Sequence, residues 1–504
     1  MRRAMKVLAG AGALLVVGAG ACAAMWPERF AVNGPILSML LGQGIAAPPE
    51  AAVVARLRPP SGATVSRFAQ DLANVRFLRF TPRGDLLASL PRSGRVLLLE
   101  PDRDGDGGSD GRREMLAGLN RPHGLDLHDG WLYVAETDAV GRIRFDPASG
   151  KTSGAFERVV TGLPGGGNHW TRTVRFGPDG WMYLTVGSSC NVCLEKDARR
   201  AAMLRYHPDG SGEEIFATGL RNSVGFDWRP EDGQIYATDN GRDLLGDDFP
   251  PCELNRLVPG GFYGWPVASG ERVPDPDFGK GQEARIAASI PPAHGFRAHN
   301  APLGMTFLRG SGVPPEYRGA AIVALHGSWN RTRKDGYKVV SLHWGPGGRI
   351  EERDFLTGFL GATDDDVIGR PVDAAEGPDG SVYVSDDYAG SIYRVQWKGA
   401  ASASRSASAV AAETRGVSAP AMTTSPEALV RGQALWKRYA CAVCHDPKAA
   451  TPGMVTKKLE GLSRRYDAST LAAYLRTPQP PMPAFDLSDA ERADLALFLL
   501  SQHP

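Results

Sequence analysis

The chain has 504 residues, enough for two or three domains. Its 57 basic and 56 acidic residues give a formal net charge of +1, so the composition indicates neither a nucleic acid nor an acidic partner. The 61 glycines and 38 prolines, without a long low-complexity tract, indicate a turn-rich β protein rather than a disordered one.

The N-terminal region has the features of an export signal. Basic residues precede an apolar run at 7–26, the pattern of a secretory n-region and h-region. The run is also long enough to span a bilayer. We therefore expect residues 1–28 to be either a signal peptide or an N-terminal membrane anchor, followed by a connecting segment at 29–60. Cys22 resembles a lipidation site, although the usual leucine three positions earlier is missing.

A loose pattern then recurs: a short apolar strand, a turn of the Pro-Asp-Gly type, a second strand with Tyr or Leu, and a return strand. The copies are Val75–Glu100, Gly124–Phe145, Arg172–Tyr206, Gly225–Leu257, Leu303–Leu342 and Val372–Val395. Repeats of about 40 to 55 residues with several short strands are typical of propeller blades. We predict an all-β six-bladed propeller at 61–398. A linker at 399–424, rich in Ala, Ser and Thr, is expected to be flexible.

Two short motifs within the predicted propeller indicate local structural features. Cys190-Asn191-Val192-Cys193 lies in an exported protein, where disulfides persist, so we predict a local disulfide that braces the loop after the third blade. Cys252 remains a competing partner. The string from Asp102 to Gly107 resembles the start of an EF-hand, but its twelfth position is Arg113. It is interpreted either as a solvated turn or as a structural calcium site.

Cys441-Ala442-Val443-Cys444-His445 forms a Cys-x-x-Cys-His motif. In such a motif the thiols bind haem c covalently and the histidine binds the iron. A zinc or thioredoxin-like site would need a second ligand pair or a strand–helix context, and neither follows in the sequence. We predict that Cys441 and Cys444 attach haem c and that His445 is an axial iron ligand. Because haem c is attached outside the bacterial cytoplasm, this motif also predicts a periplasmic protein.

The flanking residues resemble a small all-α class I cytochrome c domain, at 425–504. Its first and last helices are expected to cross at Gly432 and Trp436. Met482, in a rigid Pro-Met-Pro loop, is the expected second axial ligand of the iron, whereas Met454 lies only nine residues beyond the axial histidine. His/Met ligation leaves no open iron position, so the domain is expected to transfer electrons.

The predicted blades also carry a specific series of motifs. It comprises Gly165-Gly166-Gly167-Asn168-His169, Arg221-Asn222, Thr238-Asp239-Asn240-Gly241-Arg242, Glu253-Leu254-Asn255, Gly260-Gly261-Phe262-Tyr263-Gly264-Trp265-Pro266, His299-Asn300-Ala301-Pro302-Leu303-Gly304 and His326-Gly327-Ser328-Trp329-Asn330-Arg331. This series resembles the pyrroloquinoline quinone (PQQ)-dependent sugar dehydrogenases, the family of soluble glucose and aldose dehydrogenases and L-sorbosone dehydrogenases. The resemblance covers most of 65–398 and implies that PQQ and Ca²⁺ are cofactors.

By this resemblance, His169 is the general base that removes the substrate's hydroxyl proton while hydride moves to the quinone. An imidazole suits this role because its ordinary pKa lies near neutral pH. His123 and His299 also stand at blade starts and remain rivals. Arg221 is expected to lie against the quinone carbonyls and to stabilise negative charge, with Asn222 bonded nearby.

The resemblance also implies positions for the rest of PQQ and for calcium. Arg331 and Arg370 are the expected partners of the PQQ carboxylates, because a guanidinium matches a carboxylate. The backbone carbonyls of Gly241 and Arg242 are the expected calcium ligands. The chain departs from its relatives at Asn168, where glucose dehydrogenases have Asp, and the family's PQQ-binding lysine has no clear counterpart.

These predictions describe a periplasmic dehydrogenase that oxidises an aldose or a related aldehyde and relays electrons from PQQ through haem c to a periplasmic or membrane acceptor. One alternative is a calcium-dependent propeller lactonase, but hydrolysis would supply no electrons to the cytochrome. The other is a non-catalytic propeller that docks the cytochrome, which would leave the His169, Arg221 and Gly241 series unexplained.

Overall fold

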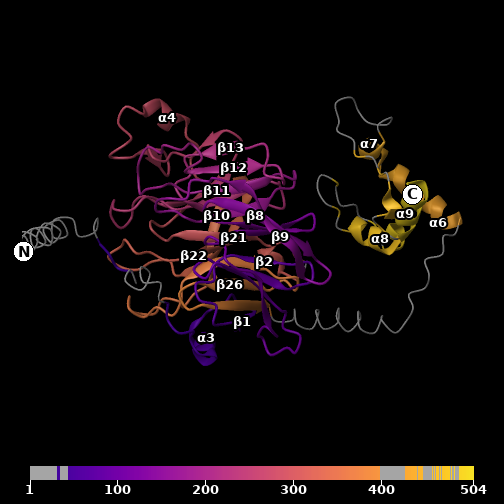
Figure 1. Cartoon of the computed structure of the whole chain (residues 1–504), viewed down its shortest axis with the longest axis horizontal. Helices are drawn as coiled ribbons and strands as arrows, with labels where there is room; N and C mark the ends of the chain where they lie inside the picture. Colours follow the sequence, from indigo (N-terminus) through magenta and orange to yellow (C-terminus); the bar gives the residue numbers. More distant parts are fainter. Residues whose placement is uncertain are drawn as a thin grey trace, which may run out of the picture. The chain divides into compact units, whose positions relative to one another are not determined.

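The computed structural model describes residues 31–34, 44–310, 312–397 and most of 426–503, with gaps at 440, 447–456, 458, 460, 465, 467, 477, 479–481, 483–486 and 488. The chain divides into two compact units, Met1–Ser404 and Arg405–Pro504 (Figure 1). The predicted leader at 1–28 and linker at 399–424 lie outside the described residues. Within the described part, no helix has both the length and the apolar character needed to cross a bilayer.

The first unit is a six-bladed β-propeller, as predicted. Blade 1 comprises β2 (Leu78–Phe80), β3 (Leu86–Leu90), β4 (Arg95–Leu99) and β5 (Arg112–Leu116); blade 2 comprises β6 (Leu125–His128), β7 (Trp131–Ala135), β8 (Ala139–Asp146) and β9 (Lys151–Thr161); blade 3 comprises β10 (Arg172–Phe176), β11 (Met182–Val186), β12 (Ala202–Tyr206), β13 (Glu214–Thr218) and β17 (Gly261–Phe262). Blade 4 comprises β14 (Ser223–Trp228), β15 (Ile235–Asp239), β16 (Cys252–Leu257) and β20 (His294–Phe296); blade 5 comprises β21 (Pro302–Phe307), β22 (Ala321–Leu325), β23 (Lys338–Trp344) and β24 (Ile350–Leu356); blade 6 comprises β25 (Pro371–Glu376), β26 (Val382–Asp386), β27 (Ser391–Trp397) and β1 (Ala63–Ala69).

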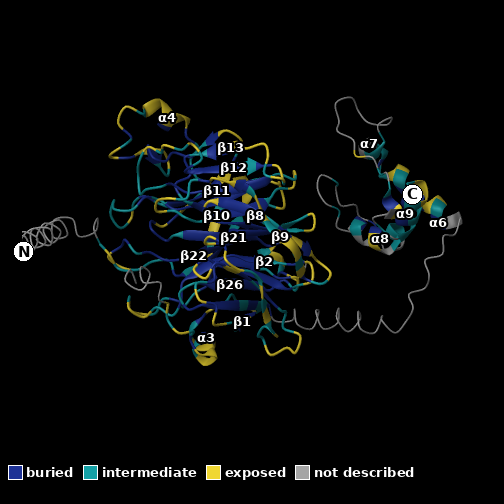
Figure 2. Ribbon diagram, in the orientation of Figure 1, coloured by how far each residue is buried: buried dark blue, intermediate teal, exposed yellow. Residues whose placement is uncertain are grey.

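Short additional elements decorate the propeller. They are α3 (Glu50–Arg56), β18 (Ala268–Ser269), β19 (Val273–Pro274), α4 (Glu283–Ala288) and the 3₁₀ turns η1 (Pro315–Tyr317) and η2 (Pro346–Gly348). Figure 2 shows that α3 and α4 are largely exposed, whereas the blade strands are mostly buried.

Hairpin turns and packing between blades account for this architecture. Gly180 and Gly380 have φ values of 80° and 76°, which only glycine adopts without cost, and they close the first hairpins of blades 3 and 6. The buried side chains cluster between neighbouring blades. In one such cluster, Tyr133 of blade 2 packs with Val174 and Leu184 of blade 3. Each blade therefore buries its apolar faces against its neighbours.

An aspartate on the first strand of every second blade bridges to the next blade. Asp126 accepts a hydrogen bond of 2.8 Å from the Phe176 amide, and Asp227 accepts one of 2.8 Å from the Phe307 amide. Asp373 completes the set by accepting from the Leu78 amide at 2.9 Å. These buried bridges join blades 2 to 3, 4 to 5 and 6 to 1.

The ring closes with an N-terminal strand. β1 pairs antiparallel with β27, with Ala63 opposite Trp397, so the outermost strand of blade 6 comes from the start of the propeller sequence. Upstream residues cross one end of the propeller: the Asn33 amide donates to the Trp329 carbonyl and the Ile45 amide to the Tyr388 carbonyl, both at 2.8 Å. We call this end, where first strands begin and second strands end, the upper face.

The second unit is helical. Its elements are α6 (Pro426–Arg438), α7 (Ala442–His445), η3 (Leu462–Arg464), α8 (Ala468–Arg476) and α9 (Asp489–Gln502). Gly432 of α6 lies directly against the Asp494 carbonyl and the Phe498 side chain of α9. The absence of a side chain at this position lets the two helices approach closely. Trp436 stands nearby, with its ring centroid 6.5 Å from that of Phe498, so the predicted crossing is confirmed.

Candidate active site

The predicted site residues meet at the upper face because of the strand order. In each blade the start of the first strand pairs with the end of the second: Arg172 lies opposite Val186 in blade 3, and Ser223 lies opposite Asp239 in blade 4. The loop before β10, the residues before β14 and the loops after β11 and β15 therefore gather at one end of blades 3 and 4. The predicted base and arginine lie in two of these segments.

His169 is held as a neutral imidazole with a defined tautomer. Its Nδ1 lies 3.0 Å from the Ser188 carbonyl oxygen and 2.8 Å from the Ser188 hydroxyl oxygen. A carbonyl oxygen only accepts, so Nδ1 carries the hydrogen and Nε2 carries the lone pair. Burial and the Arg221 charge lower the pKa of His169 to about 3. The lone pair at Nε2 is therefore available to accept a proton at neutral pH.

Arg221 is fixed by protein acceptors on all three guanidinium nitrogens. Nε donates to the Asn191 carbonyl at 2.9 Å and Nη1 to the Asn240 carbonyl at 3.0 Å. Nη2 donates to Asn191 Oδ1 at 2.8 Å and pairs with the Asp243 carboxylate at 3.0 Å. Arg221 thus places a fixed positive charge beside His169. In the neighbouring Asn222, the buried side-chain oxygen has no hydrogen-bond partner among the described residues.

The two rival histidines are engaged differently. His299 directs Nε2 to the Gly246 carbonyl at 2.9 Å, and its Nδ1 lies 3.7 Å from the Asp243 carboxylate. His123 is fully buried and lies between Phe77 and Trp170. Burial lowers the pKa of His123 well below its usual value. His123 also has an Nε2 without a partner among the described residues, but that atom is buried, and both ring nitrogens of His299 face protein oxygens. His169 differs because it is only partly buried and keeps a free basic nitrogen.

The predicted calcium-binding segment follows β15. The Arg242 side chain is buried and forms ion pairs with Asp275 at 2.6 Å and Asp277 at 2.9 Å. Pro250 and Pro251 pack against Gly241. The segment is therefore anchored on both sides, which suits a backbone that must present carbonyl oxygens. The assignment of these two carbonyls to calcium stays a prediction.

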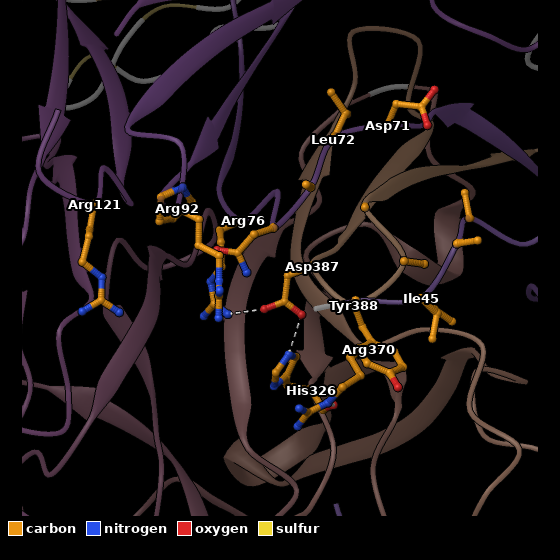
Figure 3. A pocket seen from close by; sticks show the side chains of 18 of the residues that line it. Ile45, Asp71, Leu72, Arg76, Arg92, Arg121, His326, Arg370, Asp387 and Tyr388 are labelled. Atoms are coloured by element: carbon orange, nitrogen blue, oxygen red, sulfur yellow. Dashed lines mark hydrogen bonds and ion pairs between the residues drawn. The ribbon is translucent and has the colours of Figure 1, made fainter. Parts of the chain in front are cut away.

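A cavity of about 740 Å³ opens on the upper face (Figure 3). Its wall includes buried side chains from blades 1, 5 and 6, together with Trp170, Arg92, Arg121 and the N-terminal residues 44–47. Asp387 bridges two of the buried groups, with 2.6 Å to Arg76 and 2.9 Å to His326 Nε2 (Figure 3).

The cavity is strongly cationic. Arg76, Arg92, Arg121 and Arg370 line it, whereas the lining carboxylates are Asp71 and the already paired Asp387. Burial, together with the charges of Arg92 and Arg76, lowers the pKa of Arg121, which shows that these cations repel one another. A ligand with several carboxylates would relieve that repulsion, so the cavity fits the three carboxylates of PQQ.

The two arginines predicted to bind PQQ carboxylates lie in different places. Arg370 lines the cavity, where it donates to the carbonyls of His326 at 3.2 Å and Gly327 at 2.9 Å. Arg331 lines a separate hollow of about 360 Å³ and pairs with Asp248 at 3.1 Å. The structure therefore brings Arg370, but not Arg331, to the large cavity.

Sequence reasoning missed Arg76, His326 and Asp387 as parts of the cavity wall. One signal was available. Asp387 directly follows Asp386, the last residue of the second strand of blade 6, as Asn240 follows Asp239 in blade 4. The repeat alone would therefore have placed Asp387 on the upper face.

The predicted disulfide is present between Cys190 and Cys193, with their Cα atoms 6.2 Å apart. Cys252 is a free, buried thiol, and burial raises its pKa to about 11.

In the acidic segment from Asp102 to Gly107, Asp102 accepts hydrogen bonds from the amides of Gly105 and Gly107 and pairs with Arg394 at 2.9 Å. These contacts describe a turn that is bonded both within itself and to β27. Ligand atoms of Asp102, Asp104 and Asp110 also lie within 4.8 Å of one another, so the structural calcium site stays a prediction.

In the second unit, His445 Nδ1 donates to the Lys457 carbonyl at 2.8 Å. This bond leaves Nε2 for a metal, the arrangement typical of iron-ligating histidines, so the residue fits an axial role. Cys441 is buried, whereas the side chain of Cys444 lies outside what the structure describes. Met482 packs against the leucine core of this unit, and most of its loop lies outside the described residues.

Comparisons with known proteins agree with this architecture. A family model described as Glucose / Sorbosone dehydrogenase matches residues 133–394, slightly more than half of the chain. A second model, described as cytochrome C oxidase, cbb3-type, subunit III, matches residues 427–499.

Among curated proteins, an uncharacterized protein of Borreliella burgdorferi is 33% identical over 293 residues, covering 56% of this chain and 76% of that protein. A PQQ-dependent pyranose dehydrogenase of Coprinopsis cinerea is 26% identical over 395 residues, covering 62% of this chain and 52% of the relative. The chain thus spans about half the length of this fungal relative.

Two solved structures share the propeller fold. The holo form of the PQQ domain of the Coprinopsis cinerea pyranose dehydrogenase has a TM-score of 0.58 at 23% identity, covering 69% of this chain and 98% of that one. A calcium structure of a family AA12 carbohydrate-active enzyme from Trichoderma reesei has a TM-score of 0.59 at 22% identity, with coverages of 68% and 97%. The chain belongs to the glucose/sorbosone dehydrogenase family and carries a cytochrome c domain at its C-terminal end.

Proposed function

We propose that this protein is an exported, PQQ-dependent dehydrogenase that oxidises an aldose or a related sugar or aldehyde and passes the electrons through its own haem c to a respiratory acceptor. The observation that carries the proposal is the cationic cavity on the upper face. His169 does not line this cavity, but its sequence neighbour Trp170 does, and His169 keeps a free basic nitrogen. The cytochrome c domain supports it, because an oxidation releases electrons that a hydrolysis would not. The curated relative from Coprinopsis cinerea supports PQQ as the cofactor.

The mechanism follows from the residues. When bound, PQQ supplies a two-electron hydride acceptor, haem c supplies a one-electron carrier, and Ca²⁺ supplies a Lewis acid. Arg370 and Arg76 line the cavity and would bind the carboxylates of PQQ there. His169 accepts the substrate's hydroxyl proton at Nε2 as a hydride leaves the carbon that bears this hydroxyl group. The alcohol thus loses two electrons and two hydrogens. Burial, together with the Arg221 charge, lowers the pKa of His169 and keeps it neutral before that transfer.

The cytochrome domain supplies the exit for the electrons. His445 would bind the iron through Nε2, because Nδ1 is bonded to the Lys457 carbonyl. Cys441 and Cys444 would hold the haem covalently. Met482 would complete the coordination and exclude other ligands from the iron. The carbonyls of Gly241 and Arg242 would hold Ca²⁺.

The test is a dye-reduction assay on matured protein with a panel of aldoses and aldehydes, with PQQ and Ca²⁺ added separately and together. We expect activity only when both are present. Full activity in EDTA without quinone would contradict the cofactor assignment. Hydrolysis of a lactone without PQQ would instead support the lactonase, and the absence of any turnover would support a docking module.

A further inference from the structure

The loop closed by the Cys190–Cys193 disulfide contacts the predicted catalytic groups of blades 3 and 4. Between the two cysteines, Asn191 directs both its carbonyl oxygen and its side-chain oxygen toward Arg221, at 2.9 Å to Nε and 2.8 Å to Nη2. Two adjacent acceptors on one residue thus hold the guanidinium at two of its nitrogens. Such a two-point contact fixes the orientation of the group as well as its position.

The same asparagine also holds the acidic neighbour of Arg221. Asn191 Oδ1 accepts from the Asp243 amide at 2.8 Å, and Asn191 Nδ2 donates to the Asp243 carbonyl at 3.1 Å. The Asp243 carboxylate pairs in turn with Arg221 at 3.0 Å. One side chain therefore sets the geometry of the whole ion pair, although Asn191 lies 30 and 52 residues from its two partners along the chain.

The start of the loop reaches His169. The Ser188 hydroxyl donates to the Cys190 carbonyl at 2.7 Å, which leaves its oxygen to accept from His169 Nδ1. The Asn168 amide donates to the Ser189 carbonyl at 2.9 Å. The loop therefore contacts the base, the residue before the base and the arginine.

We propose that Asn191 is a positioning residue for hydride transfer, and that the Cys190–Cys193 disulfide serves to hold its two oxygen atoms against Arg221. This inference rests on the proposed function, since it assigns a role in the same site. A four-residue ring restricts the backbone at Asn191, so the acceptors are already in place before Arg221 and Asp243 bind them. Positioning in advance in this way matters most where a small displacement lowers the rate of the chemical step.

The first experiment measures the reduction of bound quinone by substrate in single turnovers. Asn191→Ala should slow this step by roughly 10- to 100-fold, while KM changes little. Val192→Ala is the matched control, because Val192 lies in the same ring but makes none of these contacts, and it should keep the wild-type rate. A wild-type rate in Asn191→Ala, or an equal loss in Val192→Ala, would overturn the proposal.

A double-mutant cycle separates positioning from general destabilisation. If Asn191 acts through Arg221, then Asn191→Ala should cost little further rate in an Arg221→Ala background. Fully additive losses would show that Asn191 acts by another route. The double variant Cys190→Ser/Cys193→Ser, which lacks the disulfide, should also slow the reduction of bound quinone by substrate. Thiol reductants are avoided because they would also reduce the haem and the quinone. Should the double serine variant fail to fold, Asn191→Ala still decides the question, because it keeps the disulfide.

A second measurement needs neither cofactor nor turnover. Hydrogen–deuterium exchange of the PQQ-free protein should show faster exchange in peptides covering 219–223 and 239–245 in Asn191→Ala and in the double serine variant, but not in Val192→Ala. Unchanged exchange would overturn the proposal. If instead no sugar or aldehyde reduces quinone in the wild-type protein, the proposed function fails, while the exchange result still reports on the positioning.

Discussion

The Nδ1 atom of His169 lies 3.0 Å from the Ser188 carbonyl oxygen, and this contact decides which ring nitrogen can act as a base. The carbonyl can only accept, so Nε2 is left with the lone pair. The pKa of about 3, lowered by burial and by Arg221, keeps the ring neutral. The consequences can be tested separately on rate, on pH dependence and on stability.

Replacing His169 with Gln should leave folding, PQQ binding and the haem spectrum intact but slow quinone reduction by roughly 10²- to 10⁴-fold, the usual cost of losing a general base. Stopped-flow spectra that follow quinone and haem separately check this result. The defect must precede electron arrival at the haem. A wild-type rate of quinone reduction would move the base to His299 or His123.

The rate of quinone reduction should not fall as the pH drops from about 7 to about 5, because His169 takes up a proton only near pH 3. The experiment is a pH series of single-turnover rates, which avoids any pH dependence of haem oxidation. An acidic limb centred on the ordinary histidine value of 6.5 would contradict the low pKa.

The same histidine should make stability depend on pH. Between about pH 3 and 6.5 the unfolded chain binds a proton at His169 that the folded protein excludes. Protonation therefore stabilises the unfolded chain, and the free energy of unfolding decreases as the pH falls below 6.5. His169→Gln removes the effect. The difference in unfolding free energy between variant and wild type should therefore shift in favour of the variant as the pH is lowered from about 7 to about 4, measured by urea unfolding.

Two equivalent inter-blade aspartates should respond in opposite ways to the same substitution. Arg175 pairs with Asp227 at 3.2 Å, and Arg309 pairs with it at 2.8 Å. Burial would raise the pKa of Asp227, but these arginines lower it to about 2. Asp373 lacks the counterpart of Arg175, because Thr306 of blade 5 occupies the position that Arg175 occupies in blade 3. Burial raises the pKa of Asp373 to about 7.

Asp227→Asn should therefore destabilise the propeller by roughly 3–5 kcal/mol, the cost of breaking a buried ion pair. Asp373→Asn should stabilise it near pH 8, where the wild-type carboxylate is charged and buried, and should have a smaller effect near pH 5, where Asp373 is protonated in the folded state. Thermal unfolding at both values of pH checks the pair. Equal destabilisation by both substitutions would show that the missing arginine does not matter.

Met482→Ala should remove the sulfur-to-iron charge-transfer band of the oxidised haem, because a methionine in a proline-stiffened loop is the predicted second axial ligand. Met454→Ala is the matched control and should leave the band unchanged. Loss of the band in the control alone would assign the ligand to Met454 instead.

The propeller could be predicted from sequence because its inner strands carry strong local signals. The turn at Gly180, for example, is closed by a residue that must adopt positive φ. The outermost strands gave weaker signals. Most residues of β9 (Lys151–Thr161) are exposed, so this strand lacks the alternation that marks a half-buried strand.

Much of the candidate site could not be predicted because it depends on contacts distant in sequence. Asp387 meets His326 across 61 residues, and Asn191 meets Arg221 across 30. Their residue types allow many partners, and only the arrangement of the blades selects these. His169 and Arg221 were found through a resemblance to a family, whereas Asn191 was recognised in the sequence only as part of a disulfide loop.

The pairing of β1 with β27 also determines when the propeller ring can close during synthesis of the chain. Thr64 and its partner Gln396 are separated by 332 positions, so β1 is synthesised long before the strand that covers its edge. A chain interrupted before β27 keeps that edge exposed, and an exposed edge invites pairing with other chains. The cytochrome sequence follows β27, so every molecule that carries the haem motif also carries the strand that closes the ring.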